Sequence, residues 1–344
     1  MALPDNPPNP MTDDASQKRR RLIGALAKSA VSVGLLWALF SVYDIGAAIE
    51  RIAAIDPFWA AAAFAAFFVS ICVAAARWGV VLRALGVKVP LPTLATLIIM
   101  SVFFNQTLPS NLGGDAMRIW RLFRRGAGLQ RAVGSILLDH VMSLVGLALL
   151  VVIALPWAAM LIEDSVIVFV LAGIVVAVLS GLGVLLALDR AFFAVLRFLP
   201  SRLLEAILQL SRDARTVLLA RQVIGPLLLL SVATHLCGVM MMTALAYGLG
   251  IAVDLGAFMV LVPPAVLASL VPLSFAGWGV REGAMIALLG SIGIAPEEAL
   301  ALSVAFGVLL LIGSLPGGLL GQPRRPSDFR RAQARQERRL TIDG

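Results

Sequence analysis

The sequence predicts an all-α polytopic membrane protein with about six full transmembrane helices and two re-entrant hairpins arranged as an inverted repeat. Apolar residues make up 60% of the 344 residues and charged residues only 14%, and the mean hydropathy is +0.95. That composition excludes a soluble domain, which typically has about 45–50% apolar residues and about 25% charged ones. A second observation is a pattern, P-x4-G-x3-R, that begins at Pro109 and again at Pro272, where two apolar segments are interrupted.

The amino-terminal region is expected to hold a leader and the first membrane span. Residues 1–17 are rich in Pro, Asn and Asp and show no periodicity, which is typical of a disordered segment. Four basic residues at 18–21 then precede an apolar stretch from Leu22 to about Val42. Because this stretch is long enough to cross a bilayer and lacks a small-x-small cleavage site, we interpret it as a signal anchor. A single membrane domain is expected over 18–322, followed by a basic cytosolic tail over 323–344.

Five further apolar runs are each long enough to cross the membrane, because a hydrocarbon core of about 30 Å requires about twenty helical residues. They are 57–76, 133–160, 165–188, 223–248 and 299–320. Two other apolar segments, 94–108 and 256–273, are short or end at a Gly-rich break. The positions of the basic residues decide how these two segments lie.

With six spans and the amino terminus inside, the basic clusters at 18–21, 77–88, 118–131, 190–221 and 324–339 all lie on the cytosolic side. The opposite side keeps Arg51 among acidic residues. This is the asymmetry that the positive-inside rule describes. A full crossing by 94–108 would move two basic clusters outside, so we expect 94–118 to re-enter from the cytosol and 256–294 to re-enter from the other face. Both termini are then cytoplasmic.

The same layout divides the chain into two halves of inverted topology, about 22–160 and 165–320. Each half contains two spans, a hairpin and a further span. Paired, interrupted apolar segments in corresponding halves are typical of transport sites built from repeats.

Candidate binding and translocation residues lie at the two breaks, because non-helical backbone at membrane depth is tolerated only where it faces protein or a water-filled cavity. A helix that restarts after a break directs free N–H groups towards an anion. Arginine adds bidentate hydrogen bonds to phosphate, and glycine permits close backbone approach. Asp139, beside His140, is expected to close against Arg118. The candidates are Asn105, Pro109, Asn111, Gly113, Gly114, Asp115, Arg118, Asp139, Pro272, Ser274, Gly277, Gly279, Arg281 and Glu282.

Less specific interpretations remain open for these residues. Basic residues beside a membrane commonly bind anionic headgroups, and this is the interpretation that we prefer for Arg121, Arg124, Arg125 and Arg131. For Arg118 it is the alternative to a binding role. For Arg281 and Glu282 the alternative is a local ion pair near the interface. An arginine at membrane depth costs about 3 kcal/mol even on the most lenient scale, which favours a function.

The residues at both breaks resemble the flippase-like membrane domain of lysylphosphatidylglycerol synthases, over about residues 20–320. The resemblance rests on 104–118, 137–140 and 272–282, although the family usually has an Asp-Arg or similar pair where this chain has Asp139 and His140. It implies translocation of a lipid or lipid-linked anionic headgroup between leaflets of a bacterial inner membrane. Membrane phospholipids and isoprenoid-linked cargo are the implied ligands, and a lipid-modifying enzyme is a candidate partner.

The full synthases carry a soluble aminoacyl-transferase domain after the membrane region, whereas only about twenty residues follow the last span expected here. We therefore expect a stand-alone form without lysyl transfer. The sequence has no Walker motif, no metal-ligand cluster and no G-x-S-x-G elbow, so we expect neither a cofactor nor a metal, and no nucleic-acid partner. The alternatives are a membrane enzyme acting on a lipid phosphate, a small-solute secondary transporter and a non-transporting assembly partner.

Overall fold

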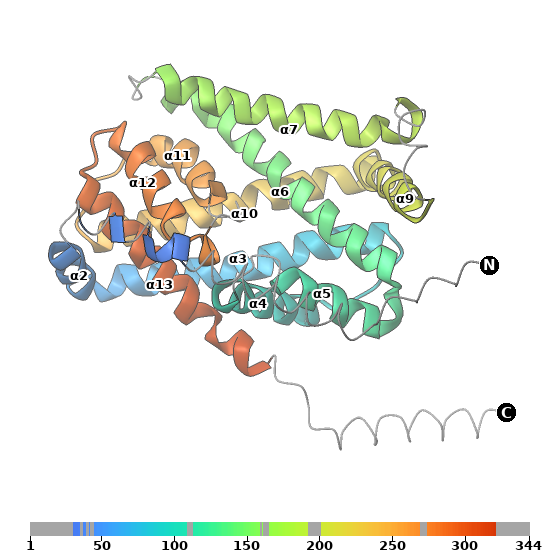
Figure 1. Ribbon diagram of the computed structural model, residues 1–344, viewed down its shortest axis with the longest axis horizontal. Helices are drawn as coiled ribbons and strands as arrows, with labels where there is room; N and C mark the ends of the chain where they lie inside the picture. Colours follow the sequence, from blue (N-terminus) through green and yellow to red (C-terminus); the bar gives the residue numbers. More distant parts are fainter. Residues whose placement is uncertain are drawn as a thin grey trace, which may run out of the picture.

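The computed structural model describes residues 30–34, 37–38, 41, 45–108, 113–158, 160, 165–191, 201–268 and 274–320. Every regular element in these ranges is a helix. The long helices lie side by side in one elongated bundle (Figure 1). The expected leader, most of the expected first span and the basic tail lie outside the described residues.

Five helices in the described part of the chain are long and apolar enough to cross a membrane. They are α3 (Pro57–Ala84), α6 (Leu129–Ala158), α7 (Ser165–Ala191), α10 (Arg221–Gly248) and α13 (Pro296–Leu320). The sequence prediction of these five spans is confirmed to within four residues at most ends. The exception is α3, which continues eight residues past the predicted end at 76.

The interrupted segments form two pairs of shorter helices. The first pair is α4 (Leu91–Thr107) and α5 (Gly113–Leu122), followed by the π-turn η1 (Phe123–Ala127). The second is α11 (Leu255–Ala268) and α12 (Val280–Gly290), with the 3-10 turn η2 (Phe275–Gly277) between them. The two helices of each pair contact one another. In Figure 1, α11 and α12 lie at one end of the bundle and α5 lies towards the other.

Two amphipathic helices were not predicted from the sequence: α2 (Ile45–Ala53) and α9 (Ser201–Leu218). In α9, Ala214 and Val217 are buried whereas Arg212 is exposed. The Arg215 Nε donates a 2.8 Å hydrogen bond to the Leu186 carbonyl of α7. The search for long apolar runs missed these helices because their apolar residues recur only every three to four positions.

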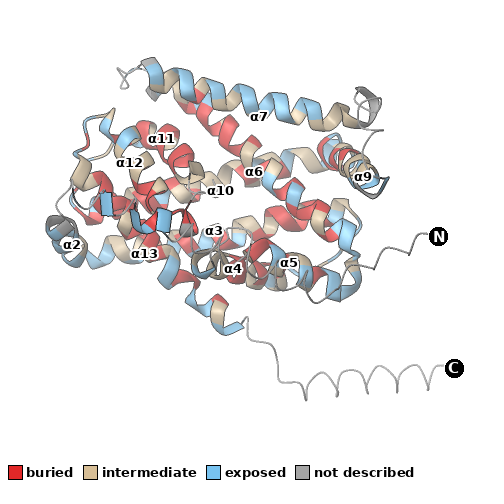
Figure 2. Ribbon diagram, in the orientation of Figure 1, coloured by how far each residue is buried: buried red, intermediate tan, exposed pale blue. Residues whose placement is uncertain are grey.

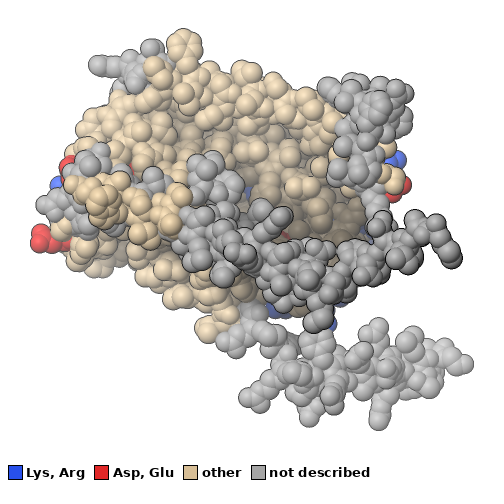
Figure 3. Space-filling model, in the orientation of Figure 1, with Lys and Arg blue, Asp and Glu red and all other residues tan. Residues whose placement is uncertain are grey.

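Burial separates the centre of the bundle from its perimeter. About three fifths of the most apolar stretch of α13, and more than half of that of α6, is buried, against 6% for α7. Figure 2 shows this contrast between α6 and α7. The exposed side chains of α7 include Val166, Phe169 and Val176, and such an apolar surface is expected on a helix that faces lipid. In Figure 3 the charged side chains gather at the two ends of the bundle and the face between them is largely uncharged.

Candidate functional site

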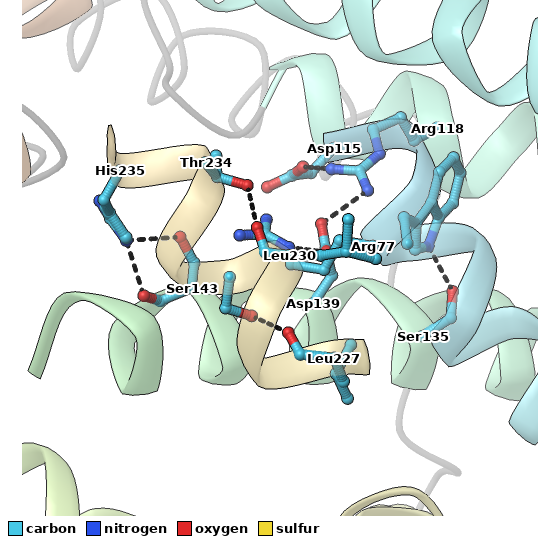
Figure 4. Close-up of polar contacts among 12 residues, drawn as sticks. Arg77, Asp115, Arg118, Ser135, Asp139, Ser143, Leu227, Leu230, Thr234 and His235 are labelled. Carbon is cyan, nitrogen blue, oxygen red and sulfur yellow. Dashed lines mark hydrogen bonds and ion pairs between the residues drawn. The ribbon is translucent and has the colours of Figure 1, made fainter. Parts of the chain in front are cut away.

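A buried cluster of charged residues lies beside the first break, where α3, α5 and α6 meet. Asp139 of α6 is at its centre. One carboxylate oxygen, Oδ1, accepts a hydrogen bond from Arg77 Nε at 2.8 Å, and the other, Oδ2, accepts one from Arg118 Nη2 at 3.1 Å. Arg118 Nη1 also donates to Asp115 Oδ1 at 3.3 Å. Figure 4 shows the two arginines approaching Asp139 from different helices.

The cluster contains two guanidinium groups and two carboxylates, and all four residues are at least nine-tenths buried. Charges removed from water carry a desolvation cost of several kcal/mol each, which opposite charges and hydrogen bonds offset. The offset is incomplete here, because Arg77 Nη1 and Arg118 Nε are buried and have no hydrogen-bond partner. The cluster therefore has guanidinium N–H groups left to donate to an anion.

Trp78 covers one face of this cluster. The Arg118 guanidinium lies 4.1 Å from the centre of the Trp78 ring, a distance at which the cation is attracted to the ring. The indole Nε1 donates to Ser135 Oγ at 3.3 Å. Arg118 is thus held by two carboxylates and an aromatic ring, which fixes the plane of its guanidinium.

His140 connects the cluster to the interior of the bundle. Its Nε2 lies 2.7 Å from Asp115 Oδ2, and its side chain is 48% exposed, whereas that of Asp139 is 3% exposed. His140 is also part of the wall of a cavity of about 340 Å³.

The predicted residues Asn105, Gly113 and Gly114 close the first break. The Gly114 N–H donates a 2.8 Å hydrogen bond to Asn105 Oδ1, which satisfies one of the free donors at the start of α5. A Cβ at Gly114 would overlap the backbone carbonyl and hydroxyl of Ser101 in α4. Gly114 therefore lets α5 approach α4 closely. Pro109 and Asn111 lie outside the described residues.

At the second break, Glu282 is the centre of a separate buried group. Its Oε1 pairs with Arg281 Nη2 at 2.6 Å and accepts a hydrogen bond from Ser303 Oγ of α13 at 3.1 Å. Its Oε2 accepts from the Gly279 N–H at 2.6 Å. Arg281 Nε donates to Ser303 Oγ at 3.1 Å. The Arg281 side chain is 2% exposed and the Glu282 side chain 0%, so this pair is sealed from solvent.

The backbone of the second break is left-handed at three residues. Ala276, Gly277 and Gly279 have φ values of 51°, 79° and 90°, a region that glycine adopts without steric cost. Gly277 and Gly279 are thus required by the turn itself. Ser274 is buried, and its Oγ has no partner. Pro272 lies outside the described residues.

A cavity of about 340 Å³ has one wall residue beside each of the two buried charged groups. His140, which contacts Asp115 of the first cluster, and Phe306, whose ring centre is 5.7 Å from the Arg281 guanidinium, both line it. Most of the wall is apolar, and α11 contributes four residues to it. The polar lining comprises Ser70, His140, Ser143, Thr234 and His235.

His235 takes part in helix packing. Its Nε2 lies 2.8 Å from the Ser143 carbonyl and joins α10 to α6. Both residues also face the cavity.

The structure brings the predicted residues together in two groups. One contains Asp115, Arg118 and Asp139, with Asn105, Gly113 and Gly114 next to it, and the other contains Gly279, Arg281 and Glu282 beside Ser274 and Gly277. Of the residues that line the cavity, His140 contacts the first group and Phe306 lies beside Arg281 of the second. Residues that the sequence analysis did not select are Arg77, Trp78, Ser303, Phe306 and the hydroxyl groups of the cavity wall.

The assignment of Arg77 to a cytosolic loop was wrong. Arg77 lies within α3 and is 5% exposed. The sequence did contain a signal, because the apolar run resumes after Arg77 with Trp78 and continues to Leu82. A single buried arginine inside a continuing helical run was the feature to recognise.

Long apolar helices with two interrupted segments and buried charge at both breaks define a polytopic helical membrane protein. The family model for the lysylphosphatidylglycerol synthase TM region matches residues 25–317. The chain therefore belongs to that family, which confirms the resemblance found in its motifs. No curated protein matches the chain.

Proposed function

We propose that this protein translocates the anionic headgroup of a lipid between the two leaflets, while the acyl or isoprenoid chains stay in the bilayer. Phospholipids and isoprenoid-linked lipids are the proposed cargo. The proposed setting is a bacterial inner membrane with both termini cytoplasmic, and the transport step itself requires no catalysis. Membership of the lysylphosphatidylglycerol synthase membrane family supports a role with lipid headgroups.

The observation that carries the proposal is the arginine cluster at the first break. Arg77 and Arg118 are buried among apolar helices, and each keeps a buried N–H group without a partner. A phosphate that reached them would gain charge-assisted hydrogen bonds, which are about twice as strong as neutral ones. Asp139 holds both arginines in place before the anion arrives.

The cavity supports the same proposal because residues in its wall lie next to both buried charged groups. A headgroup that leaves the arginine cluster would meet His140 and the hydroxyl groups of Ser143 and Thr234 before it reached Phe306 beside Arg281. An apolar wall with a few hydroxyl and imidazole groups suits a small polar group attached to an apolar chain.

The packing of the helices supports two inverted halves with re-entrant hairpins. If α3 corresponds to α10, α4 to α11, α5 to α12 and α6 to α13, each packing contact among these eight helices has a counterpart. Thus α4 packs on α13 as α11 packs on α6, and α5 packs on α6 as α12 packs on α13. The helices α3 and α10, which correspond to one another in the two halves, also pack together extensively. Such symmetry gives two equivalent arrangements, open to either face.

Reconstitution into liposomes tests the proposal with two variants. The lipids are fluorescently labelled phosphatidylglycerol, phosphatidylcholine and an isoprenoid phosphate, and leaflet exchange is followed by dithionite quenching. Gly238 lines the cavity, and a Cβ at this position would meet no atom within 4 Å. Gly238→Leu should therefore fill the cavity without displacing backbone and should abolish exchange at unchanged thermal stability. Gly181→Leu, on exposed α7 and equally free of clashes, should exchange at the wild-type rate.

Arg118→Lys is the second variant, because an ammonium cannot contact Asp115 and Asp139 as the guanidinium fork does. It should slow exchange by about tenfold or more, the effect of losing one charge-assisted hydrogen bond. Arg212→Lys on the surface of α9 is its control. Wild-type exchange in both Gly238→Leu and Arg118→Lys would overturn the proposal. Release of a chemically altered lipid from wild-type protein would instead indicate a membrane enzyme, with His140 and Asp115 as its acid–base pair.

A further inference from the structure

A second pocket, separate from the cavity and both breaks, opens at the end of the bundle where α3 ends and α4 begins. Its volume is about 430 Å³. Three stretches of chain form it: the turn from α3 to α4, the start of α4, and the segment from the end of α5 through η1 to the start of α6. The lining residues are Gly86, Val87, Lys88, Val89, Pro90, Thr93, Leu122, Arg125, Gly126, Ala127 and Arg131.

All the charged residues that line this pocket are basic. Lys88, Arg125 and Arg131 line it, and no carboxylate does. Across the described part of the chain, none of the three forms an ion pair of the kind that fixes Arg77, Arg118 and Arg281. Three like charges that converge without a counterion repel one another, and an anion relieves the repulsion.

Glycines in left-handed conformations build the pocket. Gly86 turns the chain between α3 and α4 with a φ of 78°, Gly126 bends η1 with a φ of 87°, and Gly128 turns the chain between η1 and α6 with a φ of 76°. Residues with side chains adopt this region at a cost. The two turns bring Lys88 from one side and Arg125 and Arg131 from the other to a common space.

We propose that this basic pocket binds the phosphate of an anionic phospholipid from the adjacent leaflet. The cations account for the phosphate, and Val87 and Val89 add apolar walls that a purely aqueous anion would not need. Position also favours a lipid, because the pocket lies where apolar helix α3 ends and apolar helix α4 begins, which is the level of the headgroups when α3 spans a bilayer. Clusters of basic residues at this level bind anionic lipids.

The pocket also contacts both ends of the first hairpin, the beginning of α4 and the end of α5. Pro90 and Thr93 belong to the start of α4 and its cap, and Leu122 ends α5. A bound headgroup contacts both ends and so stabilises the hairpin that carries Arg118. This inference does not depend on the proposed translocation, because a structural lipid would bind in the same way to a protein that moves no cargo.

Native mass spectrometry of the full chain, released from nanodiscs of defined composition, tests the pocket. Phosphatidylglycerol and phosphatidylcholine are the lipid probes, and inorganic phosphate is the third. The triple variant Lys88→Gln, Arg125→Gln, Arg131→Gln should bind phosphatidylglycerol about a hundredfold more weakly than wild type, since each basic residue at a membrane surface contributes roughly fivefold. Phosphatidylcholine should bind weakly to both proteins.

A second triple variant controls for net charge. Arg83, Arg212 and Arg221 are exposed, lie outside the pocket and belong to α3, α9 and α10. Their replacement by Gln removes the same total charge and should leave phosphatidylglycerol binding within about twofold of wild type. Equal loss in both triple variants would show general attraction to the surface and overturn the proposal. Binding of inorganic phosphate as tight as that of phosphatidylglycerol would make the ligand a free anion and also overturn it. Thermal melting of each variant verifies that the protein is folded.

Discussion

At the residue scale, the two arginines that follow the breaks are held differently. Arg281 has its charge neutralised by Glu282 and its Nε bonded to Ser303, whereas Arg118 shares two carboxylates with Arg77 and keeps an unpaired N–H. A fully satisfied ion pair of 2% and 0% exposed side chains is suited to fixing a fold. The cluster with unpaired donors is suited to accepting an anion.

Removing the charge of Glu282 should therefore cost mainly stability. Glu282→Gln leaves Arg281 buried without a carboxylate, and breaking a buried pair in this way costs about 3–5 kcal/mol. Glu298→Gln is the matched control, because Glu298 pairs at 2.9 Å with Arg51 at an exposed position, and such surface pairs contribute at most about 1 kcal/mol. Equilibrium unfolding by SDS titration in mild detergent measures both. If Glu282→Gln lowered the unfolding free energy no more than Glu298→Gln does, Arg281 would have found another partner.

The partners of these residues divide into those that sequence could indicate and those that it could not. Arg118, Asp139, Arg281 and Glu282 were found because charge is rare in apolar runs and because the pattern recurs. Ser303 was missed because a serine in an apolar helix carries no signal of its own. The spacing of the repeat does not select it either: Arg281 follows Arg118 by 163 positions, whereas Ser303 follows Asp139 by 164, although Asp139 and Ser303 each contact the arginine of the preceding break.

At the element scale, close approach of the helices in each hairpin determines which glycines are essential. Gly114 faces Ser101 and Asn105 of α4 with no space for a Cβ, whereas Gly283 of α12 has no atom within 4 Å of that position. Hairpin packing thus gives Gly114 a role that does not require contact with cargo.

The length of the apolar runs predicted the long helices because a membrane span must be apolar throughout. A short glycine motif, by contrast, does not distinguish helix packing from ligand contact.

Gly114→Ala should accordingly separate packing from binding. The added Cβ overlaps the backbone carbonyl of Ser101, and overpacking of this kind costs about 1–3 kcal/mol. Stability and leaflet exchange should fall together, whereas Gly283→Ala, also in a hairpin helix, should keep both. Thermal unfolding and exchange measured on the same preparations test this. A stable Gly114→Ala variant that no longer transports would instead place Gly114 against the headgroup.

At the scale of the whole molecule, we propose a direction in which the bundle crosses the membrane from the charge at its two ends. Arg125 lines the basic pocket and Arg212 belongs to α9, whereas Glu297 and Glu298 lie at the beginning of α13, where Glu298 pairs with Arg51 of α2. Figure 1 shows α9 at one end of the bundle and α2 at the other. The positive-inside rule assigns the first end to the cytosol. This is a statement about the molecule together with its membrane, so helix packing alone does not determine it.

Cysteine labelling in intact cells tests that orientation. In a background with Cys72 and Cys237 replaced by Ser, single cysteines at Ala252 and Glu297 should react with an impermeant maleimide. Cysteines at Arg125 and Arg212 should react only after the cells are opened, because the membrane blocks the reagent. All four positions are solvent-exposed or partly exposed, so burial does not explain a lack of reaction. Lys88 precedes α4, is also exposed, and should behave like Arg125 if the hairpin of α4 and α5 returns to the same side. If that hairpin crossed the membrane instead, Arg125 and Lys88 would be on opposite sides. Labelling of a cysteine at Arg125 from outside, but not of one at Lys88, would therefore exclude the two inverted halves.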